Sequence, residues 1–175
     1  HVSLLEKTSP RDRTHFIHVI RRGPDVVASL FKASKSWERA YDLASCARRW
    51  NEDVARSLGR VGHPNHHFVL YEKLTATPET VLSELVARLG LAWEPEILEL
   101  FSTAADRIIG DHETWKQNVG RPISPSKTSN IELDDAQRLH VNSLLDSRLY
   151  DQFVERTIQA TPVGRGPNRK PGRTQ

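Results

Sequence analysis

The stretch HFIHVIRRGPDVVASLF, residues 15–31, decides the fold of this chain of 175 residues. Phe16–Ile20 is a short, mostly apolar run rich in β-branched residues, typical of an interior strand of a parallel sheet. Gly23 and Pro24 end this run, and Pro24 followed by Asp25 is typical of the first turn of a helix. The stretch therefore predicts a strand, a turn and a helix in direct succession.

Apolar patterns on both sides of this stretch extend the prediction. Residues 2–5 and 67–71 are two further candidate strands. Helices are predicted over residues 37–58, 78–89, 95–101 and 134–154. The expected core of the last helix comprises Leu139, Leu144, Leu145, Leu149 and Phe153. Strands that alternate with helices indicate an α/β fold, with a parallel β-sheet flanked by helices.

The composition is that of one globular domain, with 37% hydrophobic and 27% charged residues. No apolar run is long enough to cross a bilayer, and the first residues do not resemble a signal peptide. Cys46 is the only cysteine, so no internal disulfide can form, which favours a reducing compartment. We therefore expect a cytoplasmic protein without a membrane segment, in which Cys46 is a buried filler.

The net charge of +3 arises in the C-terminal tail. Residues 161–175 hold four basic residues and no acidic one, which leaves 21 basic and 22 acidic residues elsewhere. The basic surface is therefore local, and we expect no nucleic-acid partner. Because the tail is rich in Pro, Gly and Arg, we predict a domain over residues 1–160 and a basic disordered tail over residues 161–175.

Several histidines and tryptophans are interpreted as structural residues. His18 falls within a strand that should be core, so its side chain is expected to be hydrogen-bonded there. The cluster HPNHH at residues 63–67 has no cysteine and precedes a strand, which favours solvent-facing histidines over a metal site. Trp37 and Trp50 are expected to pack in the core or between helices.

The strand, turn and helix bring groups that suit a phosphate to one point. The strand leads to Arg21 at the carboxyl edge of the sheet, where α/β proteins bind their ligands. The N–H groups at the start of the helix attract anions, and the planar guanidinium of Arg21 matches phosphate oxygens. Ser29, about two turns further on, adds a hydroxyl donor. On the residues alone an alternative stays open, in which Arg21 only pairs with Asp25.

This stretch resembles a segment of the sulfotransferases that use 3′-phosphoadenosine 5′-phosphosulfate (PAPS). The segment is commonly written as a hydrophobic strand, Arg-Asp-Pro-Arg-Asp-Val, two variable residues and Ser. In that family the Arg and the Ser hold the 3′-phosphate of PAPS, the sulfuryl donor, and they correspond to Arg21 and Ser29. Arg22 and Pro24 depart from the pattern, which has an acid and an Arg at these positions.

Three more stretches agree with the resemblance. LLEKTSP at residues 4–10 is similar to a Glu-Lys-Thr-Pro strand end beside the acceptor. Residues 69–95 are similar to a Tyr-Glu-Asp-Leu segment with its following helix. Residues 114–130 occupy the place of a late loop that closes over the nucleotide.

The resemblance also implies roles for individual residues. Glu6 corresponds to a general base for the acceptor, and Lys7 to a cation at the transferring group. Trp115 and Lys116 are expected to contact the nucleotide from the late loop, and no metal is implied. On the residues alone, Glu6 and Lys7 are instead an exposed pair at a strand end.

The implied function is transfer of a sulfuryl group from PAPS to a hydroxyl or amine acceptor, on a P-loop-like fold. The chain has no G-x-x-x-x-G-K-[ST] loop for the 5′-phosphosulfate, and it starts at His1 without any methionine. We therefore expect a sulfotransferase domain that is incomplete at its N-terminus, with weak binding of the product nucleotide PAP and little activity. Two alternatives stay open: another P-loop-related enzyme such as a kinase-like fragment, and a non-catalytic interaction domain with a basic tail.

Overall fold

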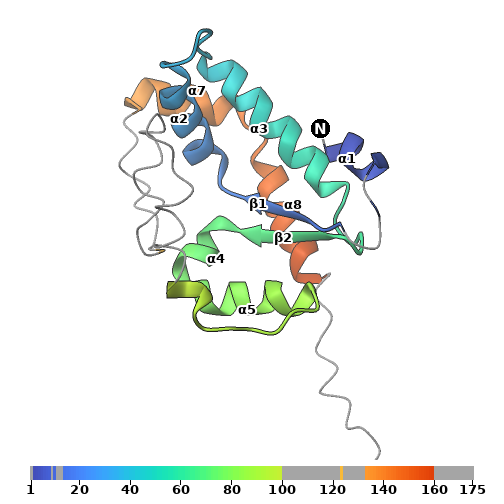
Figure 1. Cartoon of the computed structure of the whole chain (residues 1–175). Coiled ribbons are helices and arrows are strands. Elements are labelled where there is room, and N and C mark those ends of the chain that lie inside the picture. The colour runs from blue at the N-terminus through green and yellow to red at the C-terminus, as the bar shows by residue number, and fades with distance from the viewer. Residues whose placement is uncertain (1, 9, 11–13, 100–122, 124–132, 160–175) are drawn as a thin grey trace, which may run out of the picture.

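The structure is a computed structural model that describes residues 2–8, 10, 14–99, 123 and 133–159 (Figure 1). Its centre is a pair of parallel strands, β1 (Phe16–Ile20) and β2 (His66–Leu70). Phe16 lies opposite His66 and Ile20 opposite Leu70, so the two strands end at the same edge. The predicted α/β class with a parallel sheet and flanking helices is therefore confirmed.

Two helices connect the strands: α2 (Gly23–Ser34) and α3 (Leu43–Leu58). α3 begins later than predicted, because the Asp42 carboxylate caps it by accepting a hydrogen bond from the Ser45 N–H at 2.7 Å. Most of the predicted apolar stripe of α3 is buried: Ala47, Trp50, Val54 and Leu58. Cys46 is buried as expected, and burial raises the pKa of its thiol.

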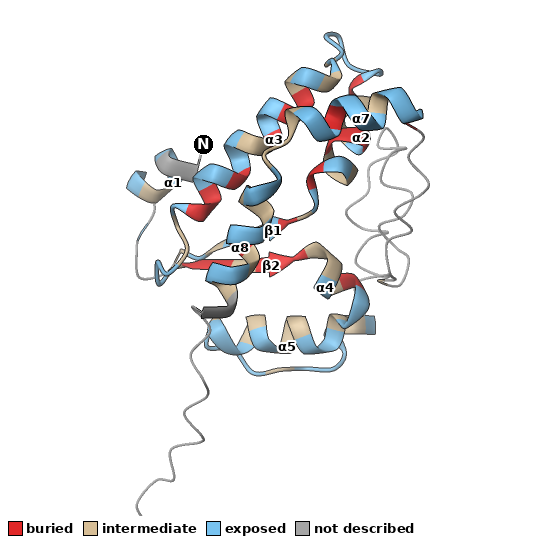
Figure 2. Cartoon of the chain, turned by 180° about the vertical axis from the view of Figure 1, so that it is seen from behind, coloured by how far each residue is buried: buried red, intermediate tan, exposed pale blue. Residues whose placement is uncertain are grey.

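The remaining long elements are α4 (Tyr71–Ala76), α5 (Pro78–Arg88), α7 (Asp135–Leu144) and α8 (Ser147–Gln159). α8 packs against α3 on one side of the sheet, where the rings of Phe153 and Phe68 meet edge to face at 5.2 Å between centroids. α5 lies on the other side of β2 from α3 (Figures 1 and 2). None of the helices within the described ranges is long and apolar enough to span a membrane.

The predicted strand over residues 2–5 is wrong. These residues belong to a helix, α1 (Val2–Thr8), in which Leu4 and Leu5 are exposed. The described part of the chain contains only the sheet of β1 and β2, so this run has no neighbouring strand there. A helix satisfies its backbone hydrogen bonds internally, which an unpaired strand cannot do.

The predicted helix over residues 134–154 is two helices, α7 and α8. The Asn51 side chain on α3 donates to Leu144 O at 2.9 Å and accepts from Asp146 N–H at 3.0 Å, which holds the break between them. Leu139, expected in the core, is 72% exposed, whereas Phe153 is fully buried as predicted. The tail at residues 161–175 lies outside the described residues, as does most of the predicted late loop.

Candidate functional site

Arg21 follows β1 directly, at the carboxyl edge of the sheet. The Trp50 indole N–H on α3 donates to the Arg21 carbonyl oxygen at 3.0 Å and fixes the backbone there. The guanidinium lies over the Tyr71 ring, 4.5 Å from its centroid, and the Arg21 Nε is 3.9 Å from Asp25 Oδ2. Burial raises the pKa of the Asp25 carboxyl, against the opposing effect of Arg21.

Ser29 lies on α2 and shares a hollow of about 500 Å³ with Arg21. We call it the Ser29 hollow, and its lining comprises Arg21, Val26, Ser29, Leu30, Ala33, Ser36 and Trp37. Ser29 is exposed, and the volume lies within the range of small-molecule sites. The structure thus brings together the two residues that the sequence assigns to the phosphate.

The start of α2 lies at the same edge. The N-cap residue Arg22 makes no side-chain capping bond, and its backbone N–H donates to Glu72 Oε1 at 2.9 Å. Gly23 is so closely packed that a Cβ there would lie 2.8 Å from Leu145 Cδ1, so only glycine fits without a shift of that side chain. Because the side chain of Arg22 does not cap α2, the first backbone N–H groups of this helix suit an anion as their partner.

Glu72 on α4 ties this turn to the C-terminal helix. The Tyr150 hydroxyl on α8 donates to Glu72 Oε2 at 2.7 Å, while Oε1 accepts the Arg22 N–H. Burial and the hydrogen bond to Glu72 raise the pKa of Tyr150 to about 12, so the phenol keeps its proton and stays a donor. The sequence carries no local signal for this contact, because the two residues are 78 positions apart.

Tyr150→Phe is expected to lower the free energy of unfolding by about 1–2 kcal/mol, because a carboxylate loses a charge-assisted hydrogen bond. Urea unfolding followed by tryptophan fluorescence measures the change. Tyr41→Phe is the matched control, because the Tyr41 hydroxyl only accepts a 3.4 Å bond from Arg49. That variant should lose less than about 0.5 kcal/mol. Equal losses in both variants would contradict a special role for the contact between Glu72 and Tyr150.

Glu6 and Lys7 lie at the other end of the sheet, on α1 rather than at a strand end. The Glu6 carboxylate accepts hydrogen bonds from Arg60 Nε at 2.6 Å and Nη2 at 3.2 Å, which lower the pKa of Glu6. Its Oε1 also lies 3.1 Å from Nε2 of His66, the first residue of β2. The strands are five residues long, so about 16 Å of sheet separates Glu6 from Arg21. The structure does not place Glu6 and Lys7 beside the Ser29 hollow.

Of the tryptophans with a predicted position, Trp37 and Trp50 are described. Trp115 and its neighbour Lys116 lie outside the described residues. Trp50 is buried in the core as expected, but Trp37 is 46% exposed and lines the Ser29 hollow. Among the described residues, no group of three or more His, Cys, Asp and Glu side chains is placed to hold a metal ion.

Four histidines in or next to the two strands form two hydrogen-bonded pairs. His66 and His67, expected to face solvent, are instead buried in β2. His15 Nδ1 lies 2.9 Å from His67 Nε2, and His18 Nε2 lies 2.8 Å from His66 Nδ1. His18 Nδ1 is also 3.3 Å from Ser57 Oγ, so the predicted hydrogen bonding of His18 within the fold is confirmed.

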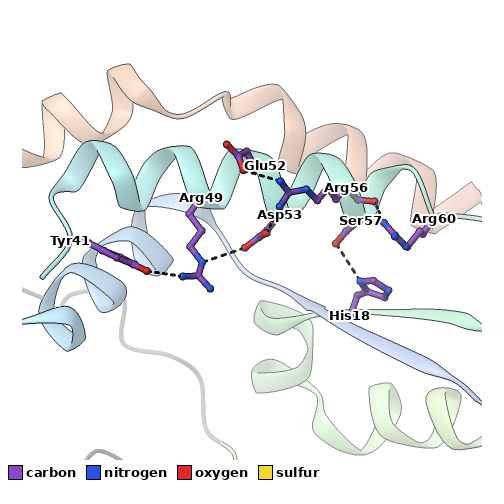
Figure 3. A network of polar contacts seen from close by, with 8 residues as sticks. All are labelled: His18, Tyr41, Arg49, Glu52, Asp53, Arg56, Ser57 and Arg60. Carbon is purple, nitrogen blue, oxygen red and sulfur yellow. Dashed lines mark hydrogen bonds and ion pairs between the residues drawn. The ribbon is translucent and has the colours of Figure 1, made fainter. Parts of the chain in front are cut away.

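His18 and Ser57 line a second hollow, of about 440 Å³, between β1 and α3. We call it the Ser57 hollow. It also contains Arg21 and Trp37, so it adjoins the Ser29 hollow. Figure 3 shows Ser57 and His18 facing each other, with Arg49 and Asp53 in contact further along α3.

The fold is that of an α/β protein with a parallel sheet, and a cation and a hydroxyl share a hollow at the carboxyl edge of that sheet. Proteins of this class typically bind their ligands at this edge. Residues 1–95 match the sequence model of the sulfotransferase family, and the chain belongs to that family.

Among solved structures, the chain is similar to the sulfotransferase domain from the curacin biosynthetic pathway, with 18% identity and a TM-score of 0.47. The match covers 82% of this chain and 57% of that one, so the chain spans little more than half of that domain. A comparison with curated proteins finds no match.

Proposed function

We propose that this chain binds the 3′-phosphate of PAPS with Arg21 and Ser29 and takes part in sulfuryl transfer to a hydroxyl or amine acceptor. The observation that carries the proposal is the hollow of about 500 Å³ that these two residues share at the carboxyl edge of the sheet. Membership of the sulfotransferase family supports it, because Arg21 and Ser29 lie within residues 1–95, which match the family model, and the sequence resemblance implies them as the phosphate ligands.

The chemistry of a phosphate explains the choice of groups. A phosphate monoester carries close to two negative charges at neutral pH, and a guanidinium can donate two parallel hydrogen bonds to it. Arg21 supplies those bonds, Ser29 a hydroxyl donor, and the start of α2 its backbone N–H groups. These contacts lie away from the reacting sulfur, so their binding energy serves to position the donor.

Sulfuryl transfer also needs groups at the reacting centre. Negative charge spreads over the equatorial oxygens while the nucleophile attacks in line with the leaving oxygen, as in phosphoryl transfer. The resemblance implies Lys7 as the cation and Glu6 as the base, but both lie on α1, away from the Ser29 hollow. Because α1 holds Glu6 at the amino end of the strands, Glu6 can take up the acceptor proton only through intermediate groups.

Binding of three nucleotides tests the proposal. By isothermal titration calorimetry, PAP is expected to bind at least about ten-fold more tightly than AMP, which lacks only the 3′-phosphate. PAP should also bind more tightly than ATP with Mg²⁺. A preference for ATP would contradict the assignment and favour a kinase-like enzyme, and equal binding of PAP and AMP would contradict a 3′-phosphate site.

A further inference from the structure

A continuous series of polar contacts, which we call the histidine relay, joins the Ser57 hollow to α1. Ser57 Oγ lies 3.3 Å from His18 Nδ1, and His18 Nε2 lies 2.8 Å from His66 Nδ1. His66 Nε2 in turn lies 3.1 Å from Glu6 Oε1. Arg60 holds the far end with a 2.6 Å hydrogen bond to Glu6. The relay thus connects side chains from α3, β1, β2 and α1.

The far end of the relay fixes the direction of its hydrogen bonds. Glu6 is a carboxylate that only accepts, and the bond from Arg60 keeps it charged. The contact between Glu6 and His66 lacks hydrogen-bond geometry, but the negative charge beside Nε2 favours the proton on that nitrogen. Neutral His66 then accepts at Nδ1, so His18 donates from Nε2 and accepts at its own Nδ1. Ser57 must therefore donate its hydroxyl proton to His18.

This direction determines what the Ser57 hollow can recognise. A hydroxyl that donates to His18 still has oxygen lone pairs, so Ser57 presents a hydrogen-bond acceptor. The rest of the lining includes the apolar residues Ile20, Leu30 and Trp37, together with Arg21 and the pair of Arg49 and Asp53, which lie 3.7 Å apart. The hollow therefore suits an apolar molecule that carries an O–H or N–H donor.

We propose that the Ser57 hollow binds the sulfuryl acceptor, an apolar alcohol, phenol or amine, and that the histidine relay takes up its proton. This inference rests on the proposed function, because it assigns the acceptor side of the same reaction. Arg21 lines both hollows, so the acceptor would lie next to the proposed nucleotide site. Ser57 contacts the acceptor, and His18 and His66 act through it.

The proton balance of the reaction follows the relay. The acceptor oxygen or nitrogen forms a bond to sulfur, while the bond from sulfur to the bridging oxygen of PAPS breaks and its electron pair leaves with PAP. The acceptor proton passes to Ser57, the Ser57 proton to His18 Nδ1 and the His18 Nε2 proton to His66 Nδ1. His66 then carries a proton on each ring nitrogen, and the Glu6 carboxylate, with Oε1 3.1 Å from Nε2, offsets the charge of this imidazolium.

The groups around the relay keep both imidazoles neutral, as the relay requires, because a protonated imidazole has no acceptor nitrogen. Burial lowers the pKa of His18 to about 4, and His66 and Arg60 add to this effect against Glu6. Burial also lowers the pKa of His66. The charged and titratable groups that face His66 are Glu6, His63, Arg60, His67 and its relay partner His18.

The histidine tautomers test the direction of the relay. In nitrogen–proton correlation NMR of the full chain at about pH 7, His18 and His66 are each expected to carry their proton on Nε2. Glu6→Ala should remove this preference at His66, whereas Glu52→Ala, at an exposed acid on α3, should leave it unchanged. A proton on Nδ1 of either histidine in the unmodified chain would overturn the relay.

Two probes test the acceptor site. 2-Naphthol and 2-methoxynaphthalene share an apolar body, but only the first has a donor, so we expect the chain to bind 2-naphthol about five-fold more tightly. Ser57→Ala should abolish this preference, while Ser143→Ala, at an exposed hydroxyl on α7, should keep it. A missing preference, or one that survives Ser57→Ala, would overturn the site. If the preference holds but PAP does not bind, the proposed function fails and the donor-recognising hollow stands.

Discussion

Arg21→Ala is expected to weaken PAP binding by about ten-fold to a hundred-fold while leaving the fold intact, because a phosphate dianion loses its charge-assisted hydrogen bonds. The side chain of Arg21 is 22% exposed and contacts Asp25 and the Tyr71 ring at the edge of the sheet. The Arg21 carbonyl, which Trp50 binds, is unaffected by the substitution. Calorimetry measures the affinity, and circular dichroism checks the fold.

Two further variants distinguish the loss of a contact in the Ser29 hollow from the loss of one positive charge on the protein. Arg56→Ala removes the same charge, but Arg56 is 65% exposed, pairs with Glu52 and Asp53, and does not line the Ser29 hollow. It should therefore leave PAP affinity nearly unchanged. Arg21→Lys keeps the charge without the planar fork and should recover only part of the affinity. An unaltered PAP affinity in a folded Arg21→Ala variant would show that another group holds the phosphate.

The proximity of Arg21 and Ser29 could be predicted because the two residues are close in sequence. Arg21, the Gly23-Pro24 turn and Ser29 lie within one strand, turn and helix, so the position of each follows from its neighbours. The helix periodicity fixes the face on which Ser29 falls relative to Val26 and Leu30, and these residues line the same hollow. Short-range pattern and local geometry agree at this point of the chain.

The histidine relay depends on contacts between distant residues, which no local sequence pattern predicts. His18 and His66 are 48 residues apart, and they meet only because β1 and β2 pair in parallel with a particular register. A shift of one residue would move His66 to the other face of the sheet. Glu6 reaches the relay from a helix where an apolar run predicted a strand. Each of these features is decided by tertiary packing rather than by propensity.

Local signals also failed where packing overrode them. The apolar spacing over residues 134–154 fits one helix, yet the Asn51 side chain binds backbone groups of Leu144 and Asp146 and breaks it. Trp37 is a large apolar residue, and the sequence predicts it in the core or between helices. Because α3 starts at Leu43, Trp37 lies in the connection between α2 and α3, where it lines both hollows. The exposed Trp37 is therefore a feature of the site rather than of the core.

Acidification from about pH 6.5 to pH 4 is expected to lower the free energy of unfolding by about 2–3 kcal/mol through His18, with allowance for its partial exposure. A histidine in the unfolded chain titrates near 6.5, whereas burial lowers the pKa of His18 to about 4 in the folded chain. Between these values the unfolded state binds more protons. The stabilisation is therefore fully present above about pH 6.5 and is lost as the pH falls toward 4.

Protonation of the carboxylates changes the free energy of unfolding at lower pH than protonation of the histidines does. The histidine contribution can therefore be measured separately. The Arg60 hydrogen bond lowers the pKa of Glu6, and Asp146 is affected in the same way by Arg148, so their protonation destabilises the fold only at lower pH. Urea unfolding at about pH 7 and about pH 5 should therefore differ mainly through histidines. His18→Gln should reduce that difference, whereas His140→Gln, at an exposed position on α7, should not.

A direct titration of His18 by NMR links this prediction to the acceptor site. A pKa near 4 requires an imidazole that is largely dehydrated and held neutral between Ser57 and His66. A measured pKa near 6.5 would mean that water reaches the imidazole and that its charged form is as stable as in the unfolded chain. The histidine relay would then lack an uncharged His18 at mildly acidic pH, and Ser57 would no longer be confined to presenting an acceptor. The same measurement therefore bears on the acid stability of the fold and on the direction of proton transfer.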